Sequence, residues 1–475
     1  MYIGVDNIAR KIKNAYVGVD GKARKIKAVY VGVNGIARLV WKLGGRLGKV
    51  KNYLSVKKTT GCVANTEYGS VTSYSHSVSE YTGVSSKNPK VVYANSMTYI
   101  YNFYGETTNR HGFDRFVFDD SDNLVQVDSY NYGTNYYGSG GTVTHTYGIN
   151  STFEFGDCMF MSISDHAYDN STSSSTTTVR NILHNYDTKT TVFSTTNGQD
   201  LAKGVAFNDN IAVATNKRGG YGCFLKRNGD SVSYSTIWFT DANGRNLDGD
   251  YGQYGLNVVK LSENKGLFMG RAYSSAGGGL GLYAYAFKIN DDGNYITLGK
   301  LTHLPESTSY ICNSMSSSKL YDIDENHAVF IAYYGNSDSN YYKNTYVPVM
   351  IDDNLNVTFG TFYQESVGSY GAFYYHRIGN GKTFGVAVSN TSSTNLTNNY
   401  GIHMYDLNTD TNTIVDRGIV YPNVNNTGAS GSFPEMMPLG DNKIVCFDAY
   451  SERNIGGAYT HQTTLTPIIG EFNFE

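Results

Sequence analysis

A strand, a tight polar turn and a second, alternating strand recur seven times along the chain, and no other feature restricts its fold as strongly. The turns lie at residues 94–96, 156–157, 208–210, 263–265, 324–326, 379–381 and 440–442. Most units continue with a second hairpin whose turn is rich in Asp and Asn, such as residues 291–294. Because these residues favour turns and alternating apolar residues favour half-buried strands, each unit is predicted to be a four-stranded antiparallel sheet.

Repeated four-stranded antiparallel sheets are typical of a β-propeller, in which neighbouring sheets pack face to face. The chain has 42 Tyr and only 7 Pro among 475 residues, and no stretch has the length and apolar period of a helix. The sequence therefore predicts an all-β protein with an N-terminal β-hairpin repeat module and a seven-bladed β-propeller at residues 89–475. The Trp-Asp dipeptide is absent, so the array is not of the WD40 class.

A shorter repeat of 14 residues fills the N-terminal module, residues 1–43. Each unit places Asp-Asn, Asp-Gly or Asn-Gly between two β-prone runs, which predicts a hairpin with a type I′ turn. Folding the second unit about Asp20-Gly21 pairs Val19 with Lys22, and the three hairpins are expected to continue into one antiparallel meander. The residues that recur in register, and to which attachment is assigned, are Tyr2, Arg10, Tyr16, Arg24, Tyr30 and Arg38.

The N-terminal part of the chain is strongly basic. Residues 1–58 hold 14 Lys and Arg against 2 acidic residues, a net charge of +12, whereas 24 basic and 39 acidic residues give the remainder −15. Three short hairpins bury too little apolar surface to be stable alone, so the module needs a partner. Docking on an acidic surface is favoured over homo-oligomerisation, because like charges would repel one another. The basic residues follow regular strands without a nucleic-acid-binding motif, so nucleic acid is not expected as a partner.

Tandem Tyr-Val-Gly-Val-(Asp/Asn)-Gly-x-Ala-Arg-Lys-Ile-Lys units resemble those of tail-associated host-recognition proteins of phages and prophages of Gram-positive bacteria. The resemblance covers the N-terminal module and marks an attachment device. It implies a virion location, as a tail fibre or other appendage, with tail or baseplate proteins and a host-surface glycan or protein as partners. The sequence shows no secretory h-region and no apolar membrane-spanning run, so synthesis in the host cytoplasm without a signal peptide and without membrane insertion is expected.

Residues 44–88 are interpreted as a linker followed by strands of undetermined register, and residues 50–58 could supply a strand that closes the ring. The cysteines are odd in number and lie mostly in apolar runs, which predicts buried free thiols. They are Cys62, Cys158, Cys223, Cys312 and Cys446.

The long loops of the predicted propeller are rich in Tyr, Ser, Gly and Asn, as evolved recognition surfaces are. Aromatic rings also pack on the apolar faces of sugars, which favours a glycan receptor. The predicted receptor-binding residues are Tyr132, Tyr136, Tyr137, Trp238, Tyr251, Tyr254, Tyr273, Tyr334, Tyr341, Tyr342, Tyr363 and Tyr374. The alternative is that such side chains are half-buried strand residues, as is expected of Tyr99, Tyr101 and Tyr283.

Signals of catalysis are sparse, and the chain is expected not to be an enzyme. It lacks His-Glu-x-x-His, Gly-x-Ser-x-Gly, a P-loop and Cys-x-x-Cys, and no cofactor is predicted. A glycan-cleaving enzyme stays open as an alternative because four carboxylates fall in predicted long loops: Asp165, Asp241, Glu365 and Glu435. Residues 119–123 and 291–294 resemble calcium loops but lack the EF-hand span, so ordinary turns and no metal site are expected. A third alternative is a structural decoration protein without receptor binding.

Overall fold

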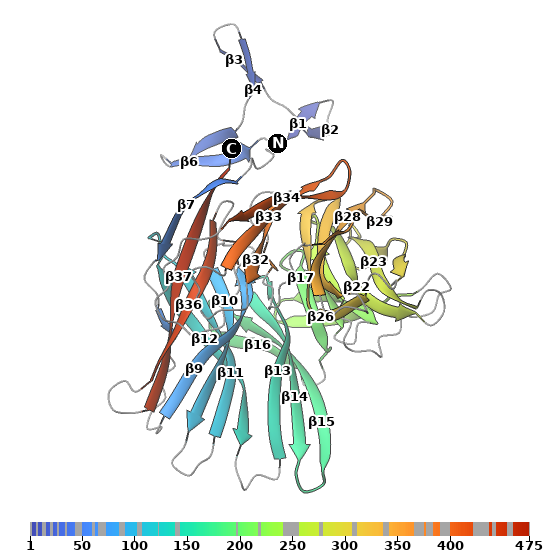
Figure 1. Ribbon diagram of the computed structural model, residues 1–475. Coiled ribbons are helices and arrows are strands. Elements are labelled where there is room, and N and C mark those ends of the chain that lie inside the picture. The colour runs from blue at the N-terminus through green and yellow to red at the C-terminus, as the bar shows by residue number, and fades with distance from the viewer. Residues whose placement is uncertain are drawn as a thin grey trace. The chain divides into compact units, whose positions relative to one another are not determined.

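The computed structural model is built from strands and turns, and none of its described residues forms a helix that could span a bilayer (Figure 1). The all-β fold class is thereby confirmed. The chain divides into two compact units, residues 1–51 with 474–475, and residues 52–473. The backbone is described for residues 2–5, 8–11, 16–19, 22–25, 28–33, 36–42, 50–58, 62–64, 73–84, 91–101, 107–121, 123–137, 143–195, 198–216, 220–240, 256–274, 279–305, 311–335, 342–364, 375–376, 383–389, 400–420, 437–438, 443–453 and 459–474.

Three hairpins lie in the first unit. They pair β1 (Tyr2–Val5) with β2 (Ile8–Lys11), β3 (Tyr16–Val19) with β4 (Lys22–Lys25), and β5 (Ala28–Val33) with β6 (Ile36–Lys42). In the second hairpin Val19 pairs with Lys22, the register that a two-residue turn requires. Among the described residues each hairpin is a separate two-stranded sheet, and the single meander expected from the sequence is not found there.

The second unit contains, among its described residues, five sheets built on four antiparallel strands in series, two of which carry a short fifth strand. Sheet 1 is formed by β13 (Val143–Phe155), β14 (Cys158–Asp169), β15 (Ser174–Asn185) and β16 (Thr190–Thr195). Sheet 2 is formed by β17 (Leu201–Ala206), β18 (Ile211–Asn216), β19 (Tyr221–Asn228) and β20 (Ser231–Trp238). Sheet 3 is formed by β21 (Asn257–Lys260), β22 (Lys265–Ser274), β23 (Gly279–Ile289) and β24 (Ile296–Leu298), with β25 (Thr302–Pro305) also on β23.

Sheets 4 and 5 repeat this pattern. Sheet 4 is formed by β26 (Ile311–Asp324), β27 (His327–Gly335), β28 (Tyr342–Ile351) and β29 (Val357–Phe359), with β30 (Tyr363–Gln364) also on β28. Sheet 5 is formed by β31 (Tyr375–His376), β32 (Thr383–Ser389), β33 (Tyr400–Asn408) and β34 (Thr413–Val420).

A further sheet of nine strands combines the two ends of the second unit. Its strands are β7 (Val50–Lys58), β8 (Cys62–Ala64), β9 (Ser73–Val84), β10 (Val91–Tyr101), β11 (Thr107–Phe118), β12 (Leu124–Tyr137), β35 (Met437–Pro438), β36 (Lys443–Arg453) and β37 (Tyr459–Phe474). A parallel pairing joins β9, which lies in the segment interpreted as a linker with strands of undetermined register, to β37 of the predicted seventh unit, and the count of seven blades is not confirmed. The turn predicted at residues 94–96 is wrong, because these polar residues lie inside β10 and pair with both β9 and β11.

The five four-stranded sheets pack face to face in chain order. Sheets 1 and 2 share a core that includes Phe155, Phe160 and Leu225, and similar clusters join sheets 2 and 3, 3 and 4, and 4 and 5. The first strands also lie beside one another, β13 with β17, β17 with β21, and β21 with β26. The other face of sheet 1, which includes Met159, packs against Val117 of the nine-stranded sheet. Successive sheets packed in this way are arranged as neighbouring propeller blades are.

The outer strands of sheets 3 and 4 are broken at a glycine that contacts the next sheet. In sheet 4, Gly360 lies between β29 and β30, and its N–H donates to the carbonyl of Pro348 at 2.8 Å. A Cβ at Gly360 would collide with the backbone carbonyl oxygen of Asn412, in the last turn of sheet 5. Gly299 occupies the equivalent place in sheet 3, where the obstacle is Leu355. The φ angles of Asn412 and Leu355 are 50° and 63°, so both contacting turns use the left-handed conformation.

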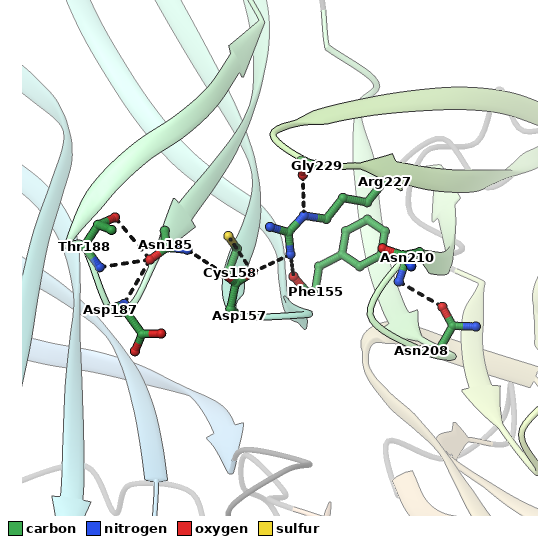
Figure 2. Close-up of polar contacts among 10 residues, drawn as sticks. All are labelled: Phe155, Asp157, Cys158, Asn185, Asp187, Thr188, Asn208, Asn210, Arg227 and Gly229. Carbon is green, nitrogen blue, oxygen red and sulfur yellow. Dashed lines mark hydrogen bonds and ion pairs between the residues drawn. The ribbon is translucent and has the colours of Figure 1, made fainter.

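Arg227 joins sheets 1 and 2 at the turn edge, which we define as the edge formed by the first and third turns of each sheet (Figure 2). Its Nη1 donates to the carbonyl of Phe155 at 2.8 Å and pairs with the Asp157 carboxylate at 2.6 Å. Its Nε donates to the carbonyl of Gly229 at 2.8 Å, and Asn185 donates to the second carboxylate oxygen of Asp157 at 2.7 Å. Burial alone would raise the pKa of Asp157, but hydrogen bonds from Arg227 and the residue's own backbone amide, with the Arg227 charge, lower that pKa below 3.8.

The Asp- and Asn-rich turns are closed by internal hydrogen bonds. Asp119 accepts hydrogen bonds from the backbone N–H groups of Ser121 and Asn123, both at 2.8 Å. Asp352 accepts the equivalent bonds from the residues two and four positions further on. The prediction of ordinary turn chemistry is thus confirmed for these turns. The described residues contain no group of three or more His, Cys, Asp or Glu side chains that could hold a metal ion.

Cys158 and Cys223 are buried free thiols, as predicted. Burial raises the pKa of Cys158 to about 11 and that of Cys223 to about 12, so neither is a reactive thiolate at neutral pH. The side chains of Cys62, Cys312 and Cys446 lie outside the described part of the chain.

Candidate functional site

Trp238 is the last residue of β20, the outer strand of sheet 2, at the edge opposite the turn edge. Its side chain is 54% exposed, whereas the adjacent Ile237 and Phe239 are 7% and 0% exposed. Because successive strand side chains point to opposite faces, the two buried neighbours fix the direction in which the indole points. Trp238 is therefore presented to solvent by a well-packed part of the sheet, which is uncommon for so large an apolar side chain.

The Trp238 ring packs on Tyr221, its cross-strand partner on β19. The ring centroids are 5.3 Å apart and the ring planes are tilted by 49°. Asn216, the last residue of β18, is 1% exposed, and its Nδ2 donates to the Tyr221 hydroxyl at 2.7 Å. This hydrogen bond holds the Tyr221 hydroxyl in place beside the indole of Trp238. Three adjacent strands of sheet 2 thus place these residues together at one edge.

This arrangement combines an exposed aromatic face with an oriented hydroxyl group. The face can pack on the apolar side of a ring. The two torsions of each aromatic side chain are restrained by the packing, which reduces the entropy lost on binding. The geometry therefore fits a flat, partly apolar and partly hydroxylated ligand.

The other predicted receptor-binding residues fall into three groups. The first group lies in strands and not in the loops that were expected. Its members are Tyr132, Tyr136 and Tyr137 of β12, Tyr273 of β22, Tyr334 of β27 and Tyr342 of β28. Tyr363 is engaged in packing: its hydroxyl donates to Asp416 at 2.7 Å, and its ring lies against Tyr346 and Tyr405. Tyr251, Tyr254, Tyr341 and Tyr374 lie outside the described residues.

The structure also tests two other predictions, that Tyr283 is a strand residue and that Asp165 is a loop carboxylate. Tyr283 is 2% exposed and packs on His303 with a centroid distance of 4.2 Å, so its prediction as a strand residue is confirmed. Asp165 lies inside β14, which runs to Asp169, so its prediction as a loop carboxylate is wrong. The Ser- and Thr-rich segment that follows continues the hairpin as β15 instead of forming a loop. Asp241, Glu365 and Glu435 lie outside the described residues.

The contribution of Tyr221 could have been found from the sequence, but it was not predicted. A two-residue turn after Asn228 pairs that residue with Ser231, and counting back from this pair places Tyr221 opposite Trp238. Asn216 has no comparable signal, because residues 217–220 separate its strand from β19 and no local rule fixes the pairing across them.

No protein-family model and no curated protein matches the chain. The subtype N11 neuraminidase-like protein of A/flat-faced bat/Peru/033/2010 (H18N11) is 11% identical over 69% of this chain and 88% of its own, with a TM-score of 0.33. The hemagglutinin-neuraminidase of parainfluenza virus 5 is 11% identical over 88% of this chain and 95% of its own, with a TM-score of 0.30. An arabinanase of Bacillus subtilis is 13% identical over 56% of this chain and 91% of its own, with a TM-score of 0.25.

The prediction that the chain is not an enzyme is wrong on this comparison, because structures named as a hemagglutinin-neuraminidase and an arabinanase are among those similar to it. At these TM-scores the likenesses assign no family, ligand or reaction to this chain.

Proposed function

We propose that the chain is a virion surface appendage that binds a host-surface glycan through its sheet array and attaches to tail or baseplate proteins through its N-terminal hairpins. One observation carries the binding part of the proposal, the exposed indole of Trp238 packed on Tyr221 beside the buried amide of Asn216. Sugar rings offer both the apolar face and the hydroxyl groups that this arrangement matches.

The attachment part rests on the sequence and on charge. Residues 1–58 carry a net charge of +12 and the rest of the chain −15, so the two parts suit different partners. The resemblance of the repeats to those of phage tail proteins supports a particle as the partner of the basic part. Hairpins as short as β1–β2 and β3–β4 gain stability when their open edges and faces are covered by another protein.

The glycan proposal is tested with full-length protein on an array of bacterial cell-wall and capsular polysaccharides. We expect the wild-type protein to bind, and Trp238→Ala to weaken binding about tenfold or more, because it removes the exposed aromatic face. Tyr295→Ala is the matched control, since Tyr295 is 57% exposed at the turn edge of sheet 3. Equal loss in both variants, or no binding by the wild-type protein, would contradict the proposal. Chromatography of the same incubations detects any released oligosaccharide and so measures glycan cleavage directly.

The attachment proposal is tested by removing residues 1–43. We expect the shortened chain to keep the unfolding temperature of the second unit and its glycan binding, but to be absent from particles, because the basic hairpins are missing. Incorporation is measured by immunoblotting of particles purified by density gradient. Charge reversal at Arg10, Arg24 and Arg38 is expected to act in the same direction without removing the hairpins. Normal incorporation of the shortened chain would show that attachment lies elsewhere.

A further inference from the structure

The hairpin formed by β14 and β15 extends beyond the core of sheet 1, at the edge where Trp238 lies in sheet 2. Residues 158–163 of β14 are buried, whereas from residue 164 onward the strand is only partly buried or exposed. On β15, residues 174–177 are exposed and residues 181–185 are buried. Six residues of β14 thus continue past the packed region, a length of about 20 Å at about 3.3 Å per residue. We call this segment, residues 164–179, the extension.

The two faces of the extension can be assigned from the packing of the same strands nearer the core. Cys158 and Phe160 belong to the core shared with sheet 2, and Phe160 pairs with Leu183, which lies in that core too. The pairing of β14 with β15 continues without a register shift to Asp169 and Ser174. Since side chains alternate along a strand, even-numbered residues of β14 and odd-numbered residues of β15 continue the face that is directed toward sheet 2.

These two faces differ in chemistry. The face directed toward sheet 2 carries His166 and Tyr168 on β14 and their partners Thr177 and Ser175 on β15, which are hydrogen-bonding groups without a carboxylate. The Nδ1 atom of His166 lies 3.1 Å from the Thr177 hydroxyl, and Tyr168 is 39% exposed. The opposite face carries both carboxylates of the extension, at positions 165 and 169. Alternation therefore separates the acidic groups from an aromatic and hydroxylated surface.

The extension and Trp238 lie at the same edge of two sheets that pack together. β14 and β20 both begin at the turn edge, where Arg227 of sheet 2 bonds to Asp157 and Phe155 of sheet 1 (Figure 2). Both strands lead away from that edge. The face of the extension that is directed toward sheet 2 therefore continues from the shared core toward the end of sheet 2 at which Trp238 is exposed.

We propose that this face of the extension and Trp238 form one composite binding site for a neutral, hydroxyl-rich polysaccharide. The inference rests on the proposed function and names the ligand class and the extent of its site. Tyr168 and Trp238 supply aromatic surfaces on which sugar rings can pack. Thr177 and Ser175 supply hydroxyl groups that can hydrogen-bond to the same extended ligand. A neutral ligand is favoured because the carboxylates face away from the surface and no Lys or Arg lies between residues 164 and 179. The length of the extension suits several consecutive sugar units.

The test measures binding of full-length variants to the polysaccharide that the wild-type protein binds. We expect Tyr168→Ala to weaken binding about tenfold and Thr177→Val about threefold to tenfold, the loss of one aromatic contact and one hydrogen bond. Thr176→Val is the matched control, because Thr176 is exposed on the opposite face of the same strand, and it should change binding less than twofold. Thermal unfolding of each variant shows whether the fold is kept.

The outcomes separate this inference from the proposed function. Loss of binding in Trp238→Ala, with unchanged binding in Tyr168→Ala and Thr177→Val, would overturn the composite site and leave the proposed function standing. Equal loss in Thr176→Val and Thr177→Val would overturn the assignment of the faces. A wild-type protein that binds no glycan would overturn both proposals. Binding to an anionic polysaccharide that is lost at high salt would overturn the neutral ligand class, since neutral contacts are little affected by ionic strength.

Discussion

Replacing Gly360 with alanine is expected to lower the free energy of unfolding by about 3 kcal/mol, because the new methyl group meets backbone instead of a movable side chain. The Cβ would collide with the carbonyl oxygen of Asn412 and would lie 2.8 Å from its Cγ. Asn412 is 7% exposed and lies in a turn that already has positive φ, so it has little room to retreat. Chemical denaturation of the variant and the wild-type protein measures the difference.

Gly229→Ala is the matched control for this prediction. Gly229 has a φ of 58° and a Cβ there would meet nothing within 4 Å, so only backbone strain of about 1 kcal/mol is expected. Gly299→Ala should resemble Gly360→Ala, because Leu355 presents the same obstacle one sheet earlier. If Gly360→Ala is no more costly than Gly229→Ala, the contact between the broken outer strand and the next sheet does not contribute to stability as inferred.

Replacing Arg227 with methionine is expected to cost about 3 kcal/mol of unfolding free energy. The Arg227 side chain is 10% exposed and reaches two backbone carbonyl groups and one carboxylate, so its removal leaves the carbonyl of buried Phe155 without that donor. Methionine keeps most of the side-chain volume, so the loss reports the polar contacts. Arg417→Met is the control: Arg417 pairs with Asp406 within sheet 5 and is 33% exposed, so a cost below about 1 kcal/mol is expected.

The cost of Arg227→Met should also depend on pH. The pKa of Asp157 is lowered in the folded state, so the pair contributes stability above the ordinary Asp pKa of 3.8 and loses it as pH falls through the lowered value. The difference between wild-type and variant unfolding free energies is therefore expected to be constant near neutral pH and to shrink below about pH 4. Denaturation curves at pH 7 and pH 3 check this expectation. A difference that does not change with pH would mean that the carboxylate takes no part in the contact.

Turns are the part of the fold that the sequence predicts best. The first turns of sheets 1, 2 and 4 lie at residues 156–157, 207–210 and 325–326, at or overlapping the predicted positions. Such turns depend on Asp, Asn and Gly, whose preference for tight backbone conformations acts over a few residues. The joining of β9 to β37 depends on residues at opposite ends of the second unit, and no local pattern encodes it.

Strand ends are predicted less well where the segment is polar. The segments around Tyr132 and Asp165 are expected to be loops because Tyr, Ser, Thr and Asn are frequent there, but they lie in β12 and β14. Tyr and Thr also favour strands, and a polar segment lacks the apolar alternation that identifies a half-buried strand. Trp238 could be predicted because it ends a clear alternating strand, whereas the position of its neighbour Asn216 depends on a pairing across four intervening residues.

The unbroken register of β14 and β15 constrains how this surface can change between related proteins. Substitution at residue 166, 168, 175 or 177 alters one chemical group and leaves all others facing the same way. Insertion of a single residue in β14 beyond Ile163 would exchange the two faces and turn the acidic groups toward sheet 2. Insertion of two residues would preserve the faces and lengthen the surface. Natural variants of this chain are therefore expected to differ here by substitutions and by length changes of even number, and sequencing of such variants can reveal that parity.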